Sequence, residues 1–173
     1  MTEVKAKSAL GGASAGLAAE YVVLDAEGVV PIPEHLTDEE GATLPCAAVT
    51  AAHALVYAGN IQAGDTVLIQ GTGGVSLFAL QFARALGARV IATSSSDVKL
   101  GRVHQLGASE GINYKTTPEW GDRARELTGD AGVDHIVEVG GSGTFAQSLH
   151  AIRMGGQPPT IEKVDVLAAK LPG

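Results

Sequence analysis

From residue 65 onward the chain alternates between short apolar runs rich in β-branched residues and longer stretches in which apolar residues recur every three or four positions. The first pattern favours buried strands, and the second is typical of amphipathic helices. The expected strands lie at Val67–Ile69, Arg89–Thr93, Gly111–Tyr114 and Val133–Val139, and helices are expected at residues 75–86, 98–106, 120–127 and 144–152. Alternation at this spacing predicts an α/β fold with a parallel sheet and right-handed crossovers.

A glycine turn, Gly71-Thr72-Gly73-Gly74, separates the first of these strands from the helix that follows it. The start of a helix has unpaired N–H groups and a partial positive charge. A pyrophosphate can lie there if no Cβ blocks its approach. A plain strand-to-helix turn is the simpler interpretation, but the strand, turn and helix together predict a dinucleotide-binding, Rossmann-type doubly wound sheet.

The segments on either side of this region are less regular. Upstream, Ala19–Leu24 predicts a strand, Thr37 has the character of a helix N-cap, and Cys46–Tyr57 predicts a helix. Downstream, residues 154–157 should lead into a fifth strand, but Pro158 and Pro159 cannot donate to a sheet ladder. We therefore expect the sheet to be incomplete after the fourth strand, and we divide the chain into residues 1–45, 46–157 and a divergent tail at 158–173.

Composition narrows the choice of partners and compartment. The net charge is -7 and no basic run occurs, which argues against nucleic acid or an anionic membrane surface as a partner. No stretch is long and apolar enough for a transmembrane helix, and the glycine-broken start does not resemble a signal peptide. A single cysteine excludes an intrachain disulfide and favours a cytoplasmic location.

A family resemblance is carried by several separate segments, at residues 19–33, 41–55, 63–100, 106–116 and 134–141. Together they resemble the medium-chain dehydrogenase/reductase superfamily, specifically its zinc-independent, quinone-oxidoreductase-like alcohol dehydrogenase branch. The complete enzymes have a GroES-like catalytic domain before and after the Rossmann domain. The resemblance therefore implies a truncated form, in which residues 1–45 hold a remnant of the GroES-like domain and residues 46–157 form the dinucleotide-binding domain.

The phosphate turn is expected to consist of Gly71, Gly73, Gly74 and Ser76. Ser76 replaces the usual third glycine, whose position packs the helix against the strand, and serine is small enough for that place. The resemblance adds further cofactor-binding positions: Thr50 and Val75 near the nicotinamide, Tyr114 near the adenosine, and Val139, Gly140 and Gly141 at the end of the fourth strand. Tyr114 is equally well an ordinary strand-end tyrosine, and each of the others could serve packing alone.

The end of the second strand selects the cofactor in this family. NAD-specific enzymes place an acidic residue there, where it binds the ribose hydroxyls. Here Ser94 occupies that position, Ser95 follows, and Lys99 on the next helix could add charge toward a 2′-phosphate. We therefore predict NADP(H), although the serines could merely cap the helix and Asp97 is a contrary sign unless it faces solvent.

Cys46 matches a catalytic zinc ligand of the zinc-dependent relatives. A catalytic zinc needs three protein ligands, and no histidine in this sequence forms a close-spaced pair with this cysteine. We interpret Cys46 as a small buried hydrophobe and expect no metal site. His53, near the expected cleft, is more often a satisfied helix histidine than a proton donor.

Three functions remain open. The first is an NADP(H)-binding oxidoreductase, or its cofactor-binding portion, that transfers hydride between nicotinamide and a small carbonyl, alcohol or quinone, with no catalytic residue assigned. The alternative is a catalytically inactive nucleotide-binding fragment. The third is a scaffold or homo-oligomer that associates through the exposed edge beyond the fourth strand, unless residues 164–167 cover that edge.

Overall fold

The computed structural model describes residues 10–11 and 14–157 of the chain, which divides into two units between Leu36 and Thr37. In the first unit the described residues form an isolated bridge between Leu10 and Ser14, one short 3-10 turn, η1, at Ala26–Gly28, and otherwise bends, turns and irregular backbone. The strand expected at Ala19–Leu24 is not formed there. Tyr21 is 91% exposed and Val23 is 99% exposed. A strand needs a neighbouring strand to receive its hydrogen bonds, and the described residues of this unit supply none to that segment.

The second unit begins with the expected N-cap. Thr37 Oγ1 accepts from the Glu40 N–H at 3.2 Å and Glu40 Oε2 accepts from the Thr37 N–H at 3.0 Å, a capping box that starts α2 at Asp38–Ala42. The helix expected at Cys46–Tyr57 is confirmed as an unbroken helical stretch. It consists of η2 at Leu44–Ala48, α3 at Val49–Ala52 and η3 at His53–Ala58, of which η2 and η3 are π-helical.

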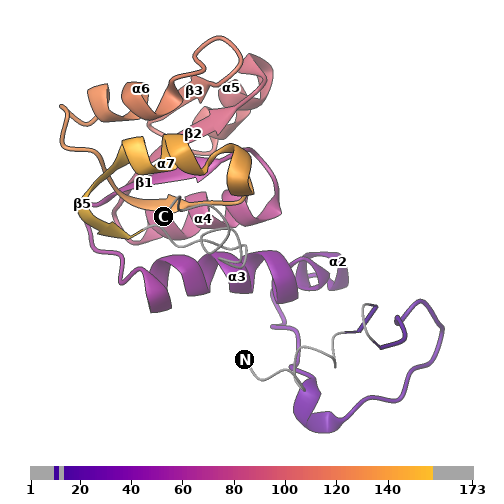
Figure 1. Cartoon of the computed structure of the whole chain (residues 1–173). Coiled ribbons are helices and arrows are strands. Elements are labelled where there is room, and N and C mark those ends of the chain that lie inside the picture. The colour runs from indigo at the N-terminus through magenta and orange to yellow at the C-terminus, as the bar shows by residue number, and fades with distance from the viewer. Residues whose placement is uncertain (1–9, 12–13, 158–173) are drawn as a thin grey trace, which may run out of the picture. The chain divides into compact units, whose positions relative to one another are not determined.

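The sheet has the predicted parallel arrangement and lies at the centre of the second unit (Figure 1). Its strand order, β3-β2-β1-β4-β5, reverses direction between β1 and β4. In such sheets ligands bind at the carboxyl ends of the strands beside this switch point. The strands are β1 at Thr66–Gln70, β2 at Arg89–Ser94, β3 at Glu110–Asn113, β4 at Val133–Val137 and β5 at Ile152–Gln157.

The strand β5 corrects the expectation that the sheet is incomplete after its fourth strand. It pairs with β4 in parallel, with Val133 opposite Ile152 and His135 opposite Gln157, and the register shifts between these two pairs. Pro158 comes directly after the last residue of β5, so its missing N–H does not interrupt the described ladder. The expected cover from residues 164–167 lies outside the described residues.

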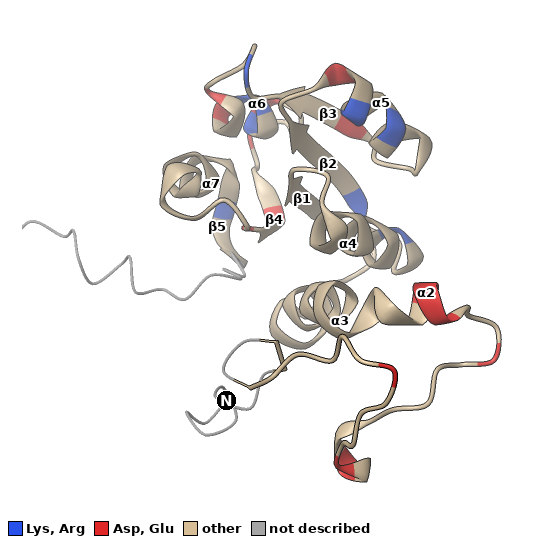
Figure 2. Ribbon diagram, turned by 90° about the vertical axis from the view of Figure 1, so that its right-hand side faces the viewer, with Lys and Arg blue, Asp and Glu red and all other residues tan. Residues whose placement is uncertain are grey.

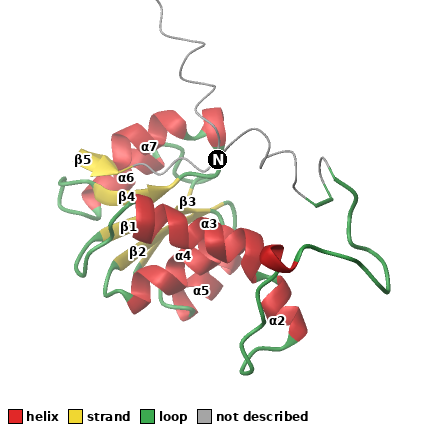
Figure 3. Cartoon of the chain, turned by 90° about the horizontal axis from the view of Figure 1, so that it is seen from below, coloured by secondary structure: helices red, strands yellow, loops and turns green. Residues whose placement is uncertain are grey.

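Helices cover both faces of the sheet, as a doubly wound fold requires (Figure 3). The helices that follow the strands are α4 at Gly74–Ala85, α5 at Asp97–Gln105, α6 at Trp120–Glu126 and, after the short turn η4 at Gly141–Gly143, α7 at Phe145–Ala151. Along β1, Val67 and Ile69 enter the core beside α4, whereas Leu68 enters the core that contains Trp120 of α6. This alternation follows from the two-residue period of a strand. Within the described residues no helix is long and apolar enough to cross a membrane.

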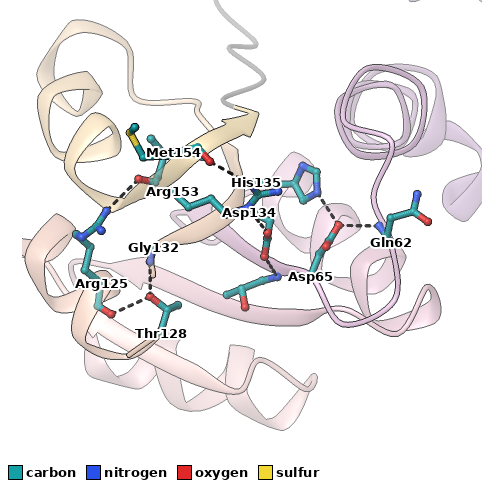
Figure 4. Close-up of polar contacts among 11 residues, drawn as sticks. Gln62, Asp65, Arg125, Thr128, Gly132, Asp134, His135, Arg153 and Met154 are labelled. Atoms are coloured by element: carbon teal, nitrogen blue, oxygen red, sulfur yellow. Dashed lines mark hydrogen bonds and ion pairs between the residues drawn. The ribbon is translucent and has the colours of Figure 1, made fainter. Parts of the chain in front are cut away.

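A polar network fixes β1, β4 and β5 at the amino edge of the sheet (Figure 4). Asp134 on β4 accepts a hydrogen bond from the Thr66 N–H at 2.8 Å and also pairs with Arg153 on β5. His135 Nε2 lies 2.9 Å from Asp65 Oδ2, and the same carboxylate oxygen accepts from the Gln62 N–H at 2.7 Å. These side chains thus join neighbouring strands at the amino edge of the sheet, which is opposite the carboxyl edge where ligands bind in such folds.

This network lowers the pKa of the Asp65 carboxyl. Partial burial raises its pKa, but the hydrogen bonds from Gln62 and His135 and the charges of His135 and Arg153 outweigh burial, so its pKa lies below the ordinary 3.8. A carboxyl whose pKa is depressed on folding stabilises the protein above the unfolded-state pKa. That contribution is lost as the pH falls through the folded-state pKa.

We therefore expect Asp65→Asn to lower the free energy of unfolding by about 1–2 kcal/mol at neutral pH, because a charged acceptor of two hydrogen bonds is lost. The difference from the unsubstituted chain should shrink as the pH falls below 3.8. Urea unfolding at a series of pH values measures both effects.

Glu126→Gln is the matched control, because Glu126 forms an exposed ion pair with Arg123 on α6. An exposed pair of this kind contributes no more than about 0.5 kcal/mol. A difference between Asp65→Asn and the unsubstituted chain that stays constant down to the acid limit would contradict the role given to Asp65.

Candidate functional site

A cavity of about 530 Å³ opens at the carboxyl edge of the sheet. It is bordered by the ends of β1 and β2, the segment after β3, the start of α6 and the loop between β4 and α7. Its lining residues are Gln70, Gly71, Thr93, Tyr114, Pro118, Trp120, Val139, Gly140, Gly143, Thr144 and Gln147. The described pocket therefore lies at the carboxyl edge of the sheet, beside the point between β1 and β4 at which the strand order reverses.

The glycine turn joins β1 to α4 beside this cavity. Gly71 has a φ of 74°, a conformation that favours glycine, and its N–H donates to the Thr93 oxygen at 2.9 Å. Gly73 is the N-cap of α4, and no side chain caps this helix start. A Cβ added to Gly71 or Gly73 would have no atom within 4 Å, so the space outside the turn is open.

Ser76 and Gly74 anchor the turn to its surroundings. The Ser76 hydroxyl is buried and donates to the Gln70 backbone oxygen at 2.7 Å, which ties the first turn of α4 to the end of β1. A Cβ on Gly74 would lie 3.2 Å from the Ala47 Cβ, so the helical stretch before β1 also approaches the turn closely. Small residues at both positions permit this packing.

The serines at the end of β2 and directly after it have different environments. Ser94 is only 3% exposed, and its Oγ accepts from the Ser96 N–H at 3.4 Å. Ser96 is the N-cap of α5, with its Oγ accepting from the Lys99 N–H at 3.4 Å, so the capping interpretation holds for Ser96. The Lys99 side chain is exposed on α5, whose basic residues are visible in Figure 2.

Asp97 is the residue that argues against NADP(H) unless it faces solvent. The residue is exposed, but its Oδ1 accepts a hydrogen bond from Asn113 Nδ2 at 2.8 Å. Asn113 ends β3, so the bond holds the first turn of α5 against the neighbouring strand. A fixed carboxylate therefore stands close to the serines that were expected to receive a 2′-phosphate.

The structure brings some of the expected cofactor residues to the cavity but not others. Four of them line the cavity directly: Gly71, Tyr114, Val139 and Gly140. The rest do not line it: Thr50, Gly73, Gly74, Val75, Ser76, Ser94, Ser95, Lys99 and Gly141. Of these, Thr50 belongs to α3, which packs against α4.

A buried acid that the sequence analysis did not single out supports the loop after β4. Glu138 is 3% exposed, and its Oε1 accepts from the N–H groups of Gly140 at 2.8 Å and Gly141 at 3.2 Å and from Thr144 Oγ1 at 2.5 Å. Its Oε2 accepts from Gln70 Nε2 at 2.7 Å and from the Ser148 hydroxyl. The carboxylate thereby connects β1, α7 and the cavity-lining loop.

Gln70 provides the second half of this support. Its Oε1 accepts from the N–H groups of Val139 at 3.2 Å and Gly140 at 3.1 Å, while its Nε2 donates to Glu138 and, at 2.8 Å, to Ser148 Oγ. One signal in the sequence could have indicated the pair. Gln70 and Glu138 are polar residues that directly follow apolar strand residues. A polar side chain in such a buried surrounding needs a hydrogen-bond partner, and this need is the signal.

Cys46 corrects another expectation, because it is exposed and not buried. It lies in the first turn of the π-helical segment η2, whose inward-facing residue is Ala48. Within the described part of the chain, no three His, Cys, Asp or Glu side chains gather closely enough to hold a metal ion.

Comparison with known proteins places this arrangement in a family. Residues 74–160 match the family model described as zinc-binding dehydrogenase. A zinc-type alcohol dehydrogenase-like protein of Schizosaccharomyces pombe is 48% identical over 157 residues, which cover 90% of this chain and 45% of the relative.

Similar solved structures are also named as dehydrogenases or oxidoreductases. A putative alcohol dehydrogenase from Sinorhizobium meliloti superposes with a TM-score of 0.82 at 50% identity, covering 86% of this chain and 43% of that one. An NAD-dependent alcohol dehydrogenase gives a TM-score of 0.80 at 41% identity, again over 86% of this chain and 43% of the other. The quinone oxidoreductase of Thermus thermophilus, solved also in complex with NADPH, gives 0.65 at 36% identity, over 75% of this chain and 41% of that one.

The chain thus spans less than half the length of these relatives. Its match to the family model nevertheless covers half of its own length and includes α4, the sheet from β2 onward and the loop after β4. The chain belongs to the zinc-binding dehydrogenase family, within the medium-chain dehydrogenase/reductase superfamily.

Proposed function

We propose that this chain binds NADP(H) at the carboxyl edge of its sheet, as the cofactor-binding portion of an oxidoreductase. The glycine turn before α4 carries the proposal. A pyrophosphate fits it, because a Cβ on Gly71 or Gly73 would enter empty space and because no side chain caps the helix start. The bound cofactor would supply hydride transfer, while this chain's residues bind and orient the nucleotide.

The preference for NADP(H) over NAD(H) rests on the end of β2. Ser94 stands where an acidic residue would select NAD, and Lys99, whose side chain is exposed, lies in the first turn of α5. The carboxylate of Asp97, held by Asn113, acts against a 2′-phosphate. Among the similar structures one is named as NAD-dependent and another was solved with NADPH, so the choice depends on this chain's own residues.

The proposed substrate is a small carbonyl, alcohol or quinone, in keeping with the named activities of the similar alcohol dehydrogenases and quinone oxidoreductase. As a location we propose the cytoplasm, on the basis of the single cysteine. Homo-oligomer formation stays a prediction.

A second candidate function, nucleotide binding without turnover, is favoured by the lining of the cavity. No His, Cys, Asp, Glu, Lys or Arg is among the described residues that border it. General acid and base chemistry uses such groups, and the hydroxyls of Tyr114, Thr93 and Thr144 are the remaining candidates.

The glycine turn is tested by Gly73→Ala. We expect the affinity for NADPH to fall at least about tenfold, because the new methyl group occupies the space of the pyrophosphate. Thermal stability should fall by no more than about 1 kcal/mol, because no atom lies within 4 Å of the added Cβ and the only loss is that alanine is a poorer helix N-cap than glycine.

Gly101→Ala on α5 is the control, since its added Cβ also meets no atom within 4 Å. It should leave nucleotide affinity unaltered. Isothermal titration and thermal unfolding measure the two quantities, and unchanged NADPH affinity in Gly73→Ala would refute binding at this turn.

The cofactor preference is tested by titrating NADPH and NADH into the same protein. We expect tighter binding of NADPH, and Lys99→Met should weaken NADPH binding roughly three- to tenfold through loss of a charge-assisted contact while sparing NADH. Arg102→Met, in the last turn of α5, is the charge-matched control. Tighter binding of NADH would overturn the argument from Ser94.

Turnover distinguishes the two candidate functions. NADPH oxidation is followed by nicotinamide absorbance with a panel of quinones and aldehydes. Substrate-dependent oxidation that Gly73→Ala abolishes supports the oxidoreductase. Tight NADPH binding without oxidation of any substrate supports the nucleotide-binding chain.

A further inference from the structure

We propose that Glu138 and Gln70 form a matched acceptor–donor pair that positions the loop after β4 for the dinucleotide. The pair joins the ends of β1 and β4 at the switch point of the sheet. Neither residue was expected to bind cofactor, and of the two only Gln70 borders the cavity. Both act as positioning residues, because their hydrogen bonds reach the loop backbone.

The first argument is burial. Glu138 is 3% exposed, Gln70 is 5% exposed and Ser148 is 2% exposed, so water cannot satisfy their polar atoms. A buried polar group without a partner is strongly destabilising. The structure meets this requirement with hydrogen bonds, and the described partners of the carboxylate are all neutral donors.

The second argument is the direction of those hydrogen bonds. The carboxylate receives five donors and can donate none, while the Gln70 amide divides its roles between Oε1, which faces the Val139 and Gly140 N–H groups, and Nε2, which faces Glu138 and Ser148. The Gly140 N–H is shared between the two side chains. Each backbone donor at the start of the loop therefore faces a side-chain oxygen, which can only accept.

The third argument is what the loop does. Val139, Gly140, Gly143 and Thr144 all border the cavity, and the loop lies beside the glycine turn across the switch point. A displaced loop would change the shape of the nucleotide site, even though the Glu138 carboxylate need not touch the ligand. Affinity depends on such preorganisation.

Glu138→Gln tests the matching of donors and acceptors. The NH₂ group that replaces one carboxylate oxygen is a donor, and it must face either the loop N–H groups or Gln70 Nε2. In every arrangement two buried donors therefore point at each other with no acceptor between them. We expect hydrogen exchange at the Gly140 and Gly141 amides to accelerate about tenfold or more, while core amides of β1 and β2 keep their protection. NADPH affinity should fall about tenfold.

The double variant Gln70→Glu with Glu138→Gln exchanges the two side chains and provides the decisive comparison. A glutamate at 70 can accept from the N–H groups of Val139 and Gly140, and a glutamine at 138 can accept from the loop and donate toward position 70. Because each donor again faces an acceptor, the exchange should restore loop protection and NADPH affinity to within about threefold of the starting protein.

Glu119→Gln is the matched control, since Glu119 also accepts from a glutamine amide, Gln147 Nε2 at 2.6 Å, but lies exposed to water. It should leave Gly140 and Gly141 exchange unaltered. If Glu138→Gln alone fails to fold, the double variant must still fold with a protected loop. A double variant that stays unprotected or unfolded, or a Glu138→Gln protein with unchanged loop exchange, overturns the proposal.

The affinity measurement rests on the proposed function, whereas hydrogen exchange does not. If the unsubstituted chain binds neither NADPH nor NADH, the proposed function fails. The loop-positioning role is then still decided by the exchange of the Gly140 and Gly141 amides in the three variants.

Discussion

A carboxylate remains inside a protein only where donors replace the water that it loses, and Glu138 meets that condition with two side-chain hydroxyls, one amide and two backbone N–H groups. These donors come from the end of β1, the loop after β4 and α7. The requirement therefore fixes three separate segments at once. Much of the geometry at the carboxyl edge of the sheet depends on satisfying this single side chain.

The parts of the fold that could be predicted are those with local signals. Apolar runs and glycine turns located β1 to β4, and Thr37 correctly marked the start of α2. The segment Ala19–Leu24 has the composition of a strand but no strand beside it among the described residues, and composition does not reveal a missing partner. The strand β5 could not be predicted from Pro158 and Pro159, which indicate where a strand must end but not that one lies immediately before them.

The candidate site also has parts that the sequence predicts and parts that it does not. The glycine turn has a sequence signature because backbone conformation at Gly71 demands one residue type. The polar residues at the ends of two apolar strands are visible in the sequence, but their pairing is not, since Glu138 and Gln70 are 68 positions apart and only the strand order brings them together. The burial of Ser94 and the bond between Asp97 and Asn113 likewise depend on how β2, β3 and α5 pack.

The empty space beside Gly73 has a consequence for kinetics. The backbone conformation of the turn is already fixed before any phosphate group would bind. The Gly71 N–H is hydrogen-bonded to the Thr93 oxygen, and Ser76 holds α4 to the end of β1. In the proposed binding mode no atom within 4 Å of a Cβ at Gly73 would have to move aside, so the encounter would need no slow opening step. Ligands of similar size and charge should then arrive at similar rates, and discrimination between them would lie in how long each one stays.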